Sequence, residues 1–206
     1  MERNAKLTKQ NILNAAIKEF SDKGLAGARI DTIAADAGCN KGMIYQYYGS
    51  KEALYECVIK YEYESLSKVE ADIVSNENMN YMDMISVIID RYFDFLFEHP
   101  DFVKIIMWEN LNEARTMKNI KTVEGYKAPI LEAVEKMVRQ GREDGVFSEN
   151  VRTRHVIFAL VTGAFSYFSN RYTLPHLLGM NLDDEKIVKT QKKILHDSIS
   201  NYLING

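Results

Sequence analysis

The chain has 206 residues, of which 46% are hydrophobic and 27% charged, enough for a real core in one globular unit or in a small domain and a larger one. It contains no apolar run long enough to span a bilayer, and its polar N-terminus lacks a signal-peptide pattern, so we expect a cytoplasmic protein with no membrane partner. Two cysteines and four scattered histidines form neither a disulfide framework nor a metal-binding spacing, and no cofactor or metal is expected.

Charge is unevenly divided along the chain. The net charge of −3 by itself argues against a nucleic-acid partner. Residues 1–60, however, hold nine Lys and Arg against seven Asp and Glu, whereas residues 61–206 hold seventeen against twenty-two. Because phosphate neutralisation is local, the first segment is compatible with DNA, although so small a basic excess would not indicate it alone.

The N-terminal segment predicts one amphipathic helix. Residues 1–7 are polar and predict a frayed end, and Thr8 is the expected N-cap of the helix. The helix is expected to end near Lys23 and Gly24. Its apolar stripe predicts a core that holds the following helices: Ile12, Leu13, Ala16, Ile17 and Phe20.

The stretch 30–48 contains two short helical patterns separated by a sharp break. Apolar residues recur at helical spacing over its first eight positions, and Gly38 ends this helix because glycine adopts the left-handed conformation without a Cβ penalty. Asn40 is a good N-cap for a second helix over about 41–47, with Ile44 facing inward. Two helices joined by a three-residue turn are typical of a helix-turn-helix, whose second helix enters the DNA major groove.

Many positions of residues 8–55 share the register of one known family. They are Ile12, Ala15, Ala16, Phe20, Gly24, Ile33, Ala34, Ala37, Gly38, Gly42, Ile44, Tyr45, Tyr47, Tyr48, Ser50, Lys51, Glu52 and Leu54. The segment resembles the DNA-binding domain of the TetR family of transcriptional repressors. Three positions depart from the pattern: Cys39 replaces an aliphatic residue, Arg29 a Ser or Thr, and Asn40 a Ser whose capping chemistry it keeps.

The resemblance and the chemistry of the side chains together assign DNA-binding roles. Lys41, Met43 and Gln46 are candidates for base edges, since Gln pairs with adenine and Met contacts a thymine methyl. The other predicted DNA-binding residues are Tyr45, Tyr47, Lys51 and Arg29 for phosphates, Gly42 for close approach, and Asn40 at the start of the helix.

The rest of the chain predicts further helices and no strand. Ser50 is expected to cap a long helix that reaches about Val74. Others are expected over about 81–99, from Pro100 to 111, and over 126–144, 151–172 and 184–203, with a loop or short turn at 115–125 and a loop at 174–183. The expected fold is all-α with about nine helices, divided into a helix-turn-helix domain (1–50) and a ligand-binding and dimerisation domain (51–206).

The partners follow from this organisation. One recognition helix reads only a few base pairs, so useful affinity needs a palindromic operator with two half-sites and therefore a homodimer. The last two long helices are apolar over more than one stripe, and the resemblance favours dimerisation through them rather than a purely internal role.

A small organic effector is the expected switch. Aromatic residues are frequent in the second domain and predict a pocket. Its candidate residues are Tyr92, Phe93, Phe97, Trp108, Asn110, Tyr126, Phe165, Phe168 and Arg171.

We therefore expect a sequence-specific transcriptional regulator that represses and is released by this effector. Ligand-independent repression or activation by the same fold stays open. An enzyme or a helical interaction module is less compatible with the sequence, which shows no catalytic arrangement or nucleotide-binding loop and keeps the residues expected to bind DNA.

Overall fold

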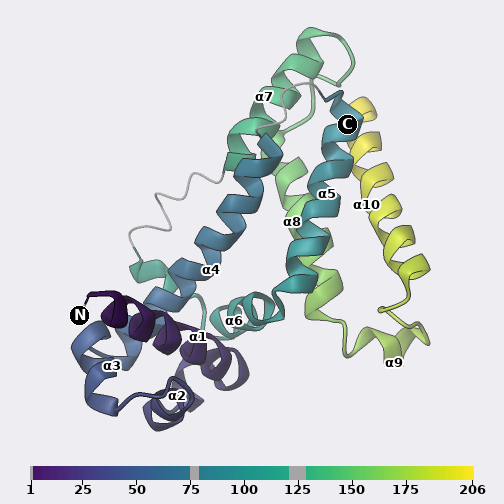
Figure 1. Ribbon diagram of the computed structural model, residues 1–206. Helices are drawn as coiled ribbons and strands as arrows, with labels where there is room; N and C mark the ends of the chain where they lie inside the picture. Colours follow the sequence, from purple (N-terminus) through teal and green to yellow (C-terminus); the bar gives the residue numbers. More distant parts are fainter. Residues whose placement is uncertain (1, 75–78, 121–128) are drawn as a thin grey trace. The chain divides into compact units, whose positions relative to one another are not determined.

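The computed structural model describes residues 2–74, 79–120 and 129–206, and these form an all-α protein, as expected (Figure 1). Within these ranges there are ten α helices and a short 3-10 helix, η1, and no strand. The elements are α1 (Glu2–Gly27), α2 (Ile30–Asp36), α3 (Lys41–Tyr48), α4 (Lys51–Val74), α5 (Tyr81–Glu98), α6 (Pro100–Leu111), η1 (Met117–Asn119), α7 (Pro129–Glu143), α8 (Thr153–Ser169), α9 (Leu174–Leu178) and α10 (Glu185–Asn205).

Contacts divide the chain into two compact units. The head comprises the described residues of Met1–Ser65 and Asp101–Tyr126, and the body those of Leu66–Pro100 and Lys127–Gly206. The division expected after residue 50, between a helix-turn-helix domain and a ligand-binding and dimerisation domain, concerns the functions of the two parts and stays a prediction. In the structure the first part of α4 and nearly all of α6 belong to the head.

The head is built around one apolar core. Phe20 is fully buried and its ring lies 4.9 Å from that of Tyr55, so it is the central plug expected from the first stripe. Each such buried side chain contributes about 1.5–3 kcal/mol. Nine core residues from α1 to α4 and from α6 have no exposed surface: Ile12, Ala16, Phe20, Ile33, Ile44, Leu54, Val58, Ile59 and Ile105.

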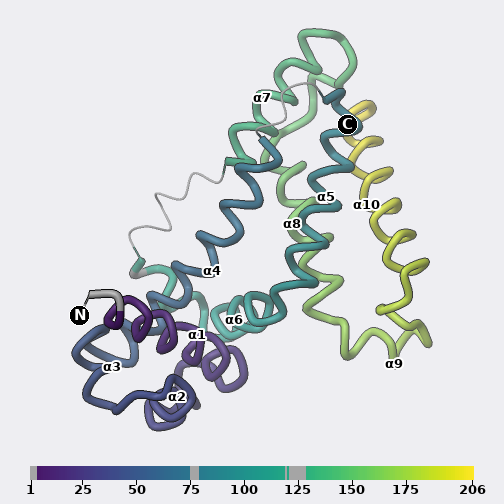
Figure 2. The backbone as a smooth tube through the Cα atoms, in the orientation of Figure 1, coloured from purple at the N-terminus to yellow at the C-terminus, as the bar shows by residue number. Residues whose placement is uncertain are grey.

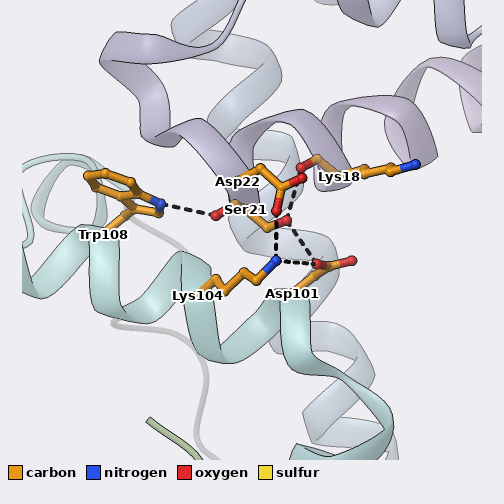
Figure 3. A network of polar contacts seen from close by, with 6 residues as sticks. All are labelled: Lys18, Ser21, Asp22, Asp101, Lys104 and Trp108. Atoms are coloured by element: carbon orange, nitrogen blue, oxygen red, sulfur yellow. Dashed lines mark hydrogen bonds and ion pairs between the residues drawn. The ribbon is translucent and has the colours of Figure 1, made fainter. Parts of the chain in front are cut away.

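Polar contacts hold α6 against α1 (Figure 3). The indole Nε1 of Trp108 donates a hydrogen bond to the carbonyl of Ser21 at 3.0 Å. The hydroxyl of Ser21 donates to Asp101 at 2.8 Å, and the ammonium of Lys104 lies 2.6 Å from the carboxylate of Asp22. The hydrogen bond from Lys104 holds the pKa of the Asp22 carboxyl below its ordinary value.

Trp108 also covers the point where α1 leaves helical geometry. Gly24 has φ 63° and ψ 175°, a conformation that is essentially restricted to glycine. A Cβ atom at this position would lie 2.8 Å from Cδ2 of the indole. The helix expected to end near Gly24 therefore breaks there, and a further helical stretch reaches Gly27.

Two local expectations were wrong. The structure places Thr8 inside α1, where its hydroxyl donates to the carbonyl of Asn4, a bond that helices accommodate. Residues 174–183, expected as a loop, include α9 and raise the number of helices from nine to ten. Pro175 lies in its first turn and Gly179 ends it with φ 64°, so these two residues delimit a short helix.

The body is a helical layer in which α5 packs against α8 and α10, and α8 packs against α7 and α10. Figure 2 shows α5, α8 and α10 side by side. The ring of Phe93 lies 5.4 Å from that of Tyr167 and 5.5 Å from that of Phe168, so aromatic contacts join α5 to α8. The close approach of α8 and α10 depends on Gly163, because a Cβ there would lie 2.6 Å from the side chain of Leu195.

Two carboxylates are buried in the head. Glu109 accepts hydrogen bonds from the backbone N–H groups of Thr116 and Met117 at 3.2 and 3.1 Å. Glu62 is 4% exposed, and its Oε2 has no hydrogen-bond partner. Burial, with a smaller contribution from the nearby Asp101, raises the pKa of Glu62 to about 7.

Gly24→Ala tests the contact with Trp108. We expect a loss of about 2–3 kcal/mol in the free energy of unfolding, because the backbone conformation is unsuitable for alanine and the indole must move. Gly38→Ala, at a positive φ with open space around it, should cost less, about 1–2 kcal/mol. Urea unfolding of Gly24→Ala with and without Trp108→Ala measures the coupling; an equal cost in both backgrounds would contradict the contact.

Glu62→Gln tests the buried carboxyl. The folded state holds its proton up to a pKa of about 7, above the ordinary value of 4.5. The contribution of this carboxyl to the free energy of unfolding is therefore fully present below pH 4.5 and is lost as the pH rises through 7. The variant should lack this decline and be more stable than wild type above pH 7 by about 3 kcal/mol. The exposed Glu64→Gln is the control, and parallel pH profiles of wild type and Glu62→Gln would refute the assignment.

Candidate nucleic-acid interface and effector cavity

The helix-turn-helix is formed by α2, a tight turn and α3. The turn is closed by hydrogen bonds from the N–H of Gly38 to Ala35 at 3.1 Å and from that of Cys39 to Ala34 at 3.0 Å. Gly38 has φ 64°, the left-handed conformation expected for a helix stop. Helix α3 is anchored by Ile44, which is fully buried in the head core.

Asn40 caps α3, as predicted. Its Oδ1 accepts a hydrogen bond from the N–H of Met43 at 3.0 Å, which satisfies one of the free donors of the first turn. A Cβ at Gly42 would lie 3.1 Å from the same oxygen, so glycine leaves room for the cap as well as for an approaching partner. Ser50 caps α4 in the same way, accepting from the N–H of Ala53 at 3.0 Å.

The outer face of α3 is open to a partner. Lys41, Tyr45 and Gln46 are exposed, and Met43 and Tyr47 are half-buried. Five polar or polarisable side chains thus surround the single buried anchor of an eight-residue helix, a surface that hydrogen-bonding partners can reach.

Two of these side chains have partners within the head. The ammonium of Lys41 lies 2.7 Å from the carboxylate of Asp31, and this hydrogen bond raises the pKa of the lysine. Both groups are exposed, so the pair opens at little cost. The ammonium of Lys9 lies 5.3 Å from the ring centroid of Tyr47, and the hydroxyl of Tyr48 donates to the carbonyl of Lys9 at 2.8 Å.

Arg29 and Lys51 flank this surface. The side chain of Arg29 is exposed and makes no capping bond to α2; its backbone N–H donates to Glu19 at 2.9 Å. Lys51, at the first position of α4, points its ammonium to the carbonyl of Ala26 at 3.4 Å. The nine predicted DNA-binding residues therefore lie on α3 and on the chain segments next to the two motif helices.

A cavity of about 470 Å³ lies in the body between α5, the end of α8 and the start of α10. Four of the nine predicted pocket residues line it: Phe93, Phe97, Phe168 and Arg171. Apart from Arg171, the charged residues of the cavity were not predicted from the sequence. Asp90 and Asp94 were recognisable in principle, because they share one stripe of α5 with Phe93 and Phe97.

Four other predicted pocket residues lie among the described residues, and none of them lines this cavity. Tyr92 is buried and donates a hydrogen bond to Glu70, whose pKa is raised by burial, and Phe165 is half-buried on α8. Trp108 and Asn110 belong to the head, where the amide of Asn110 donates to the carbonyl of Ile106 at 2.9 Å. Tyr126 lies outside the described residues.

Neither a metal centre nor a membrane span is seen in the part of the chain that the structure describes. No group of three or more His, Cys, Asp and Glu side chains is arranged to hold a metal ion there. No helix within the described ranges combines the length and apolar character needed to cross a bilayer.

Comparison with known protein families gives a match for each of the two parts of the chain. The family described as "Bacterial regulatory proteins, tetR family" matches residues 12–58, and "Tetracyclin repressor-like, C-terminal domain" matches residues 82–199, more than half of the chain. The HTH-type transcriptional repressor NicS of Pseudomonas putida is 32% identical over 185 residues, covering 87% of this chain and 84% of NicS. The repressor SCO4008 of Streptomyces coelicolor is 34% identical over 164 residues, 79% of each chain.

Solved structures share the fold. A TetR-like transcriptional regulator from Rhodococcus sp. RHA1 is 19% identical with a TM-score of 0.69, covering 97% of each chain. FadR of Bacillus subtilis, solved in complex with stearoyl-CoA, is 19% identical with a TM-score of 0.64, covering 96% of this chain and 98% of FadR.

Three observations lead to the same assignment: the capped helix α3, the extent of both family matches, and the sequence identity to repressors over most of the chain. The chain belongs to the tetR family of bacterial regulatory proteins and is a helix-turn-helix transcriptional regulator rather than an enzyme.

Proposed function

We propose that the protein is a cytoplasmic homodimeric repressor that binds a palindromic operator and leaves it when a small organic molecule binds the body. The observation that carries the proposal is α3, an eight-residue helix held by Ile44 and the Asn40 cap, on which Lys41, Tyr45 and Gln46 are exposed. The names of NicS and SCO4008, both repressors, support the direction of regulation.

The head supplies the DNA contacts in this proposal. Lys41, Met43 and Gln46 meet base edges in the major groove, while Tyr45, Tyr47 and Lys51 contact phosphates. Lys41 must first leave Asp31, an exchange of one exposed ion pair for contacts with DNA. Arg29 adds a phosphate contact, and Gly42 and Asn40 set the approach and start of the helix.

We expect the second subunit of the homodimer to pack against α8 and α10. The side chains of Phe158 and Val161 on α8 are 69% and 42% exposed, and Ile194 on α10 is 51% exposed. Burying such an apolar face between two copies stabilises a dimer, and helices of both copies would form a four-helix bundle. A dimer also supplies the two recognition helices that half-sites about 34 Å apart require.

The cavity in the body is the proposed effector site. Its volume of about 470 Å³ lies within the range of small-molecule pockets, and it combines aromatic walls with charged groups. FadR of Bacillus subtilis, a protein of the same fold, was solved with stearoyl-CoA, which supports binding of organic molecules by this architecture. By linkage, effector and operator must weaken each other's binding by the same factor.

Selection of bound fragments from genomic DNA tests the proposal as a whole. We expect enrichment of fragments with an inverted repeat and reduced transcription in vitro from promoters that contain it. Increased transcription from these promoters would make the protein an activator, and the absence of any selected fragment would refute specific DNA binding.

The roles of Gln46 and Tyr47 differ and can be separated. Gln46→Ala should relax base preference at one operator position, at a cost of about 1–3 kcal/mol for the preferred base. Tyr47→Ala should weaken binding to all sequences alike, because a phosphate contact carries no base information. A protein-binding array measures both, with Tyr47→Phe as the variant that keeps the ring beside Lys9; the opposite pattern would reverse the roles.

Phe158→Glu tests the dimer face. The buried charge should dissociate the dimer and reduce affinity for the palindrome toward that for a half-site. Leu177→Glu, which alters a side chain 78% exposed on α9, is the matched control and should stay dimeric. Light scattering after gel filtration gives the mass, and circular dichroism checks the fold; a dimeric Phe158→Glu would place the interface elsewhere.

A further inference from the structure

The floor of the body cavity is a rigid aromatic cluster. Phe93 and Phe168 are 2% and 6% exposed, and the ring of Tyr167 contacts both of them. The hydroxyl of Tyr167 donates a hydrogen bond to the carbonyl of Leu182. Phe97 is 61% exposed and extends the aromatic surface outward. Aromatic faces attract cations through their quadrupole, so this floor suits an apolar body that carries positive charge.

Cationic side chains of the protein itself already lie over these aromatic rings. The ammonium of Lys192 lies 5.5 Å from the ring centroid of Phe93. The guanidinium of Arg171 lies 5.9 Å from the ring centroid of Phe97 and 5.7 Å from that of Tyr172. The cavity therefore has the geometry of a cation site that internal side chains fill.

The carboxylates paired with Lys192 and Arg171 are more accessible than these two cations, whereas the third lining cation, Lys189, is exposed. The ammonium of Lys192 lies 3.0 Å from Asp90 and 3.3 Å from Asp94, and it is 21% exposed, whereas the two carboxylates are 59% and 57% exposed. Arg171, 22% exposed, is paired at 2.6 Å with Asp183, which is 68% exposed. A carboxylate can accept more hydrogen bonds than it receives from one lysine or arginine. A ligand that enters with a hydrogen-bond donor therefore finds free acceptor sites on the solvent-exposed side of these carboxylates.

An anionic ligand is disfavoured at the same place. Four carboxylates and three cations line the cavity. The N-terminus of α10, which would otherwise attract an anion, is occupied by Asp184, whose carboxylate accepts from the N–H of Lys186 at 2.8 Å. An incoming carboxylate or phosphate would thus meet more negative than positive charge, because Lys192 and Arg171 are covered and Lys189 is the one exposed cation among the lining residues that the structure describes.

We propose that the cavity binds an organic cation, an amine or ammonium on an aromatic or short apolar body, which takes the place of Lys192 between Asp90 and Asp94. The apolar body lies on Phe93 and Phe168. Lys192 is the internal competitor, and its displacement removes an ionic link between α10 and α5. The regulatory meaning of this exchange rests on the proposed function, since α10 belongs to the proposed dimer face.

Three probes that differ only in the head group test the inference by calorimetry on the full chain: 4-phenylbutylamine, 4-phenyl-1-butanol and 4-phenylbutanoate. We expect the amine to bind at least about tenfold more tightly than the alcohol, and the carboxylate to bind most weakly. Absence of amine binding, or tighter binding of the carboxylate, would overturn the proposal.

Variants locate the amine. Asp94→Asn and Asp90→Asn should each lower its affinity about tenfold and leave that of the alcohol unchanged. Lys192→Met keeps an apolar stem over Phe93 and should raise the affinity for the amine, because the competitor is gone. Asp197→Asn is the matched control, because it makes the same substitution on α10, the helix of Lys192, but outside the cavity. This variant should bind the amine like wild type. An unchanged amine affinity in both cavity Asp variants would refute the site.

Operator binding, followed by fluorescence anisotropy on a selected genomic fragment, separates this inference from the proposed function. Amine binding that depends on Asp94 without a change in operator affinity would support the cation site and refute release through it. A cellular compound that releases DNA equally from wild type and Asp94→Asn, together with no amine binding, would overturn the cation site and leave the repressor proposal standing.

Discussion

The head depends on a contact between the indole of Trp108 and the backbone at Gly24. A Cβ at that position would lie 2.8 Å from the ring, and the indole N–H satisfies the carbonyl of Ser21 three residues earlier. The same helix, α6, buries Ile105 completely in the head core. An eight-residue helix such as α3 is unstable in isolation, so the proposed recognition helix relies on a core completed from a distant part of the chain.

Internal ion pairs occupy both of the proposed binding places. In the head, Lys41 is paired with Asp31 at 2.7 Å, and in the body Lys192 is paired with Asp90 and Asp94. The pair of Lys41 and Asp31 is exposed on both sides and contributes little to stability, so exchanging it for contacts with a ligand is inexpensive. Lys192 is only 21% exposed, and its two carboxylates are the accessible partners. In the proposed binding steps, a ligand therefore competes with an internal pair for similar contacts.

Local chemistry was sufficient to predict most of the helical framework. The cap of α3 by Asn40, the stop at Gly38 and the cap of α4 by Ser50 each depend on residues within a few positions of one another. Where prediction was wrong, two local signals competed. Thr8 is as suitable for bonding back to a helix carbonyl as for capping, and Pro175 with Gly179 can bound a loop or a short helix.

By itself, the sequence determined the all-α class, the helix-turn-helix and the family, because these follow from periodicity and from residues in fixed register. Only the tertiary structure decided which aromatic residues share a surface. It placed Trp108 in the head against α1, and Phe93, Phe97 and Phe168 around the cavity. It also brought Lys192 between two carboxylates of α5. Helical periodicity shows that a side chain faces inward, but the neighbour it meets depends on how helices distant in sequence pack together.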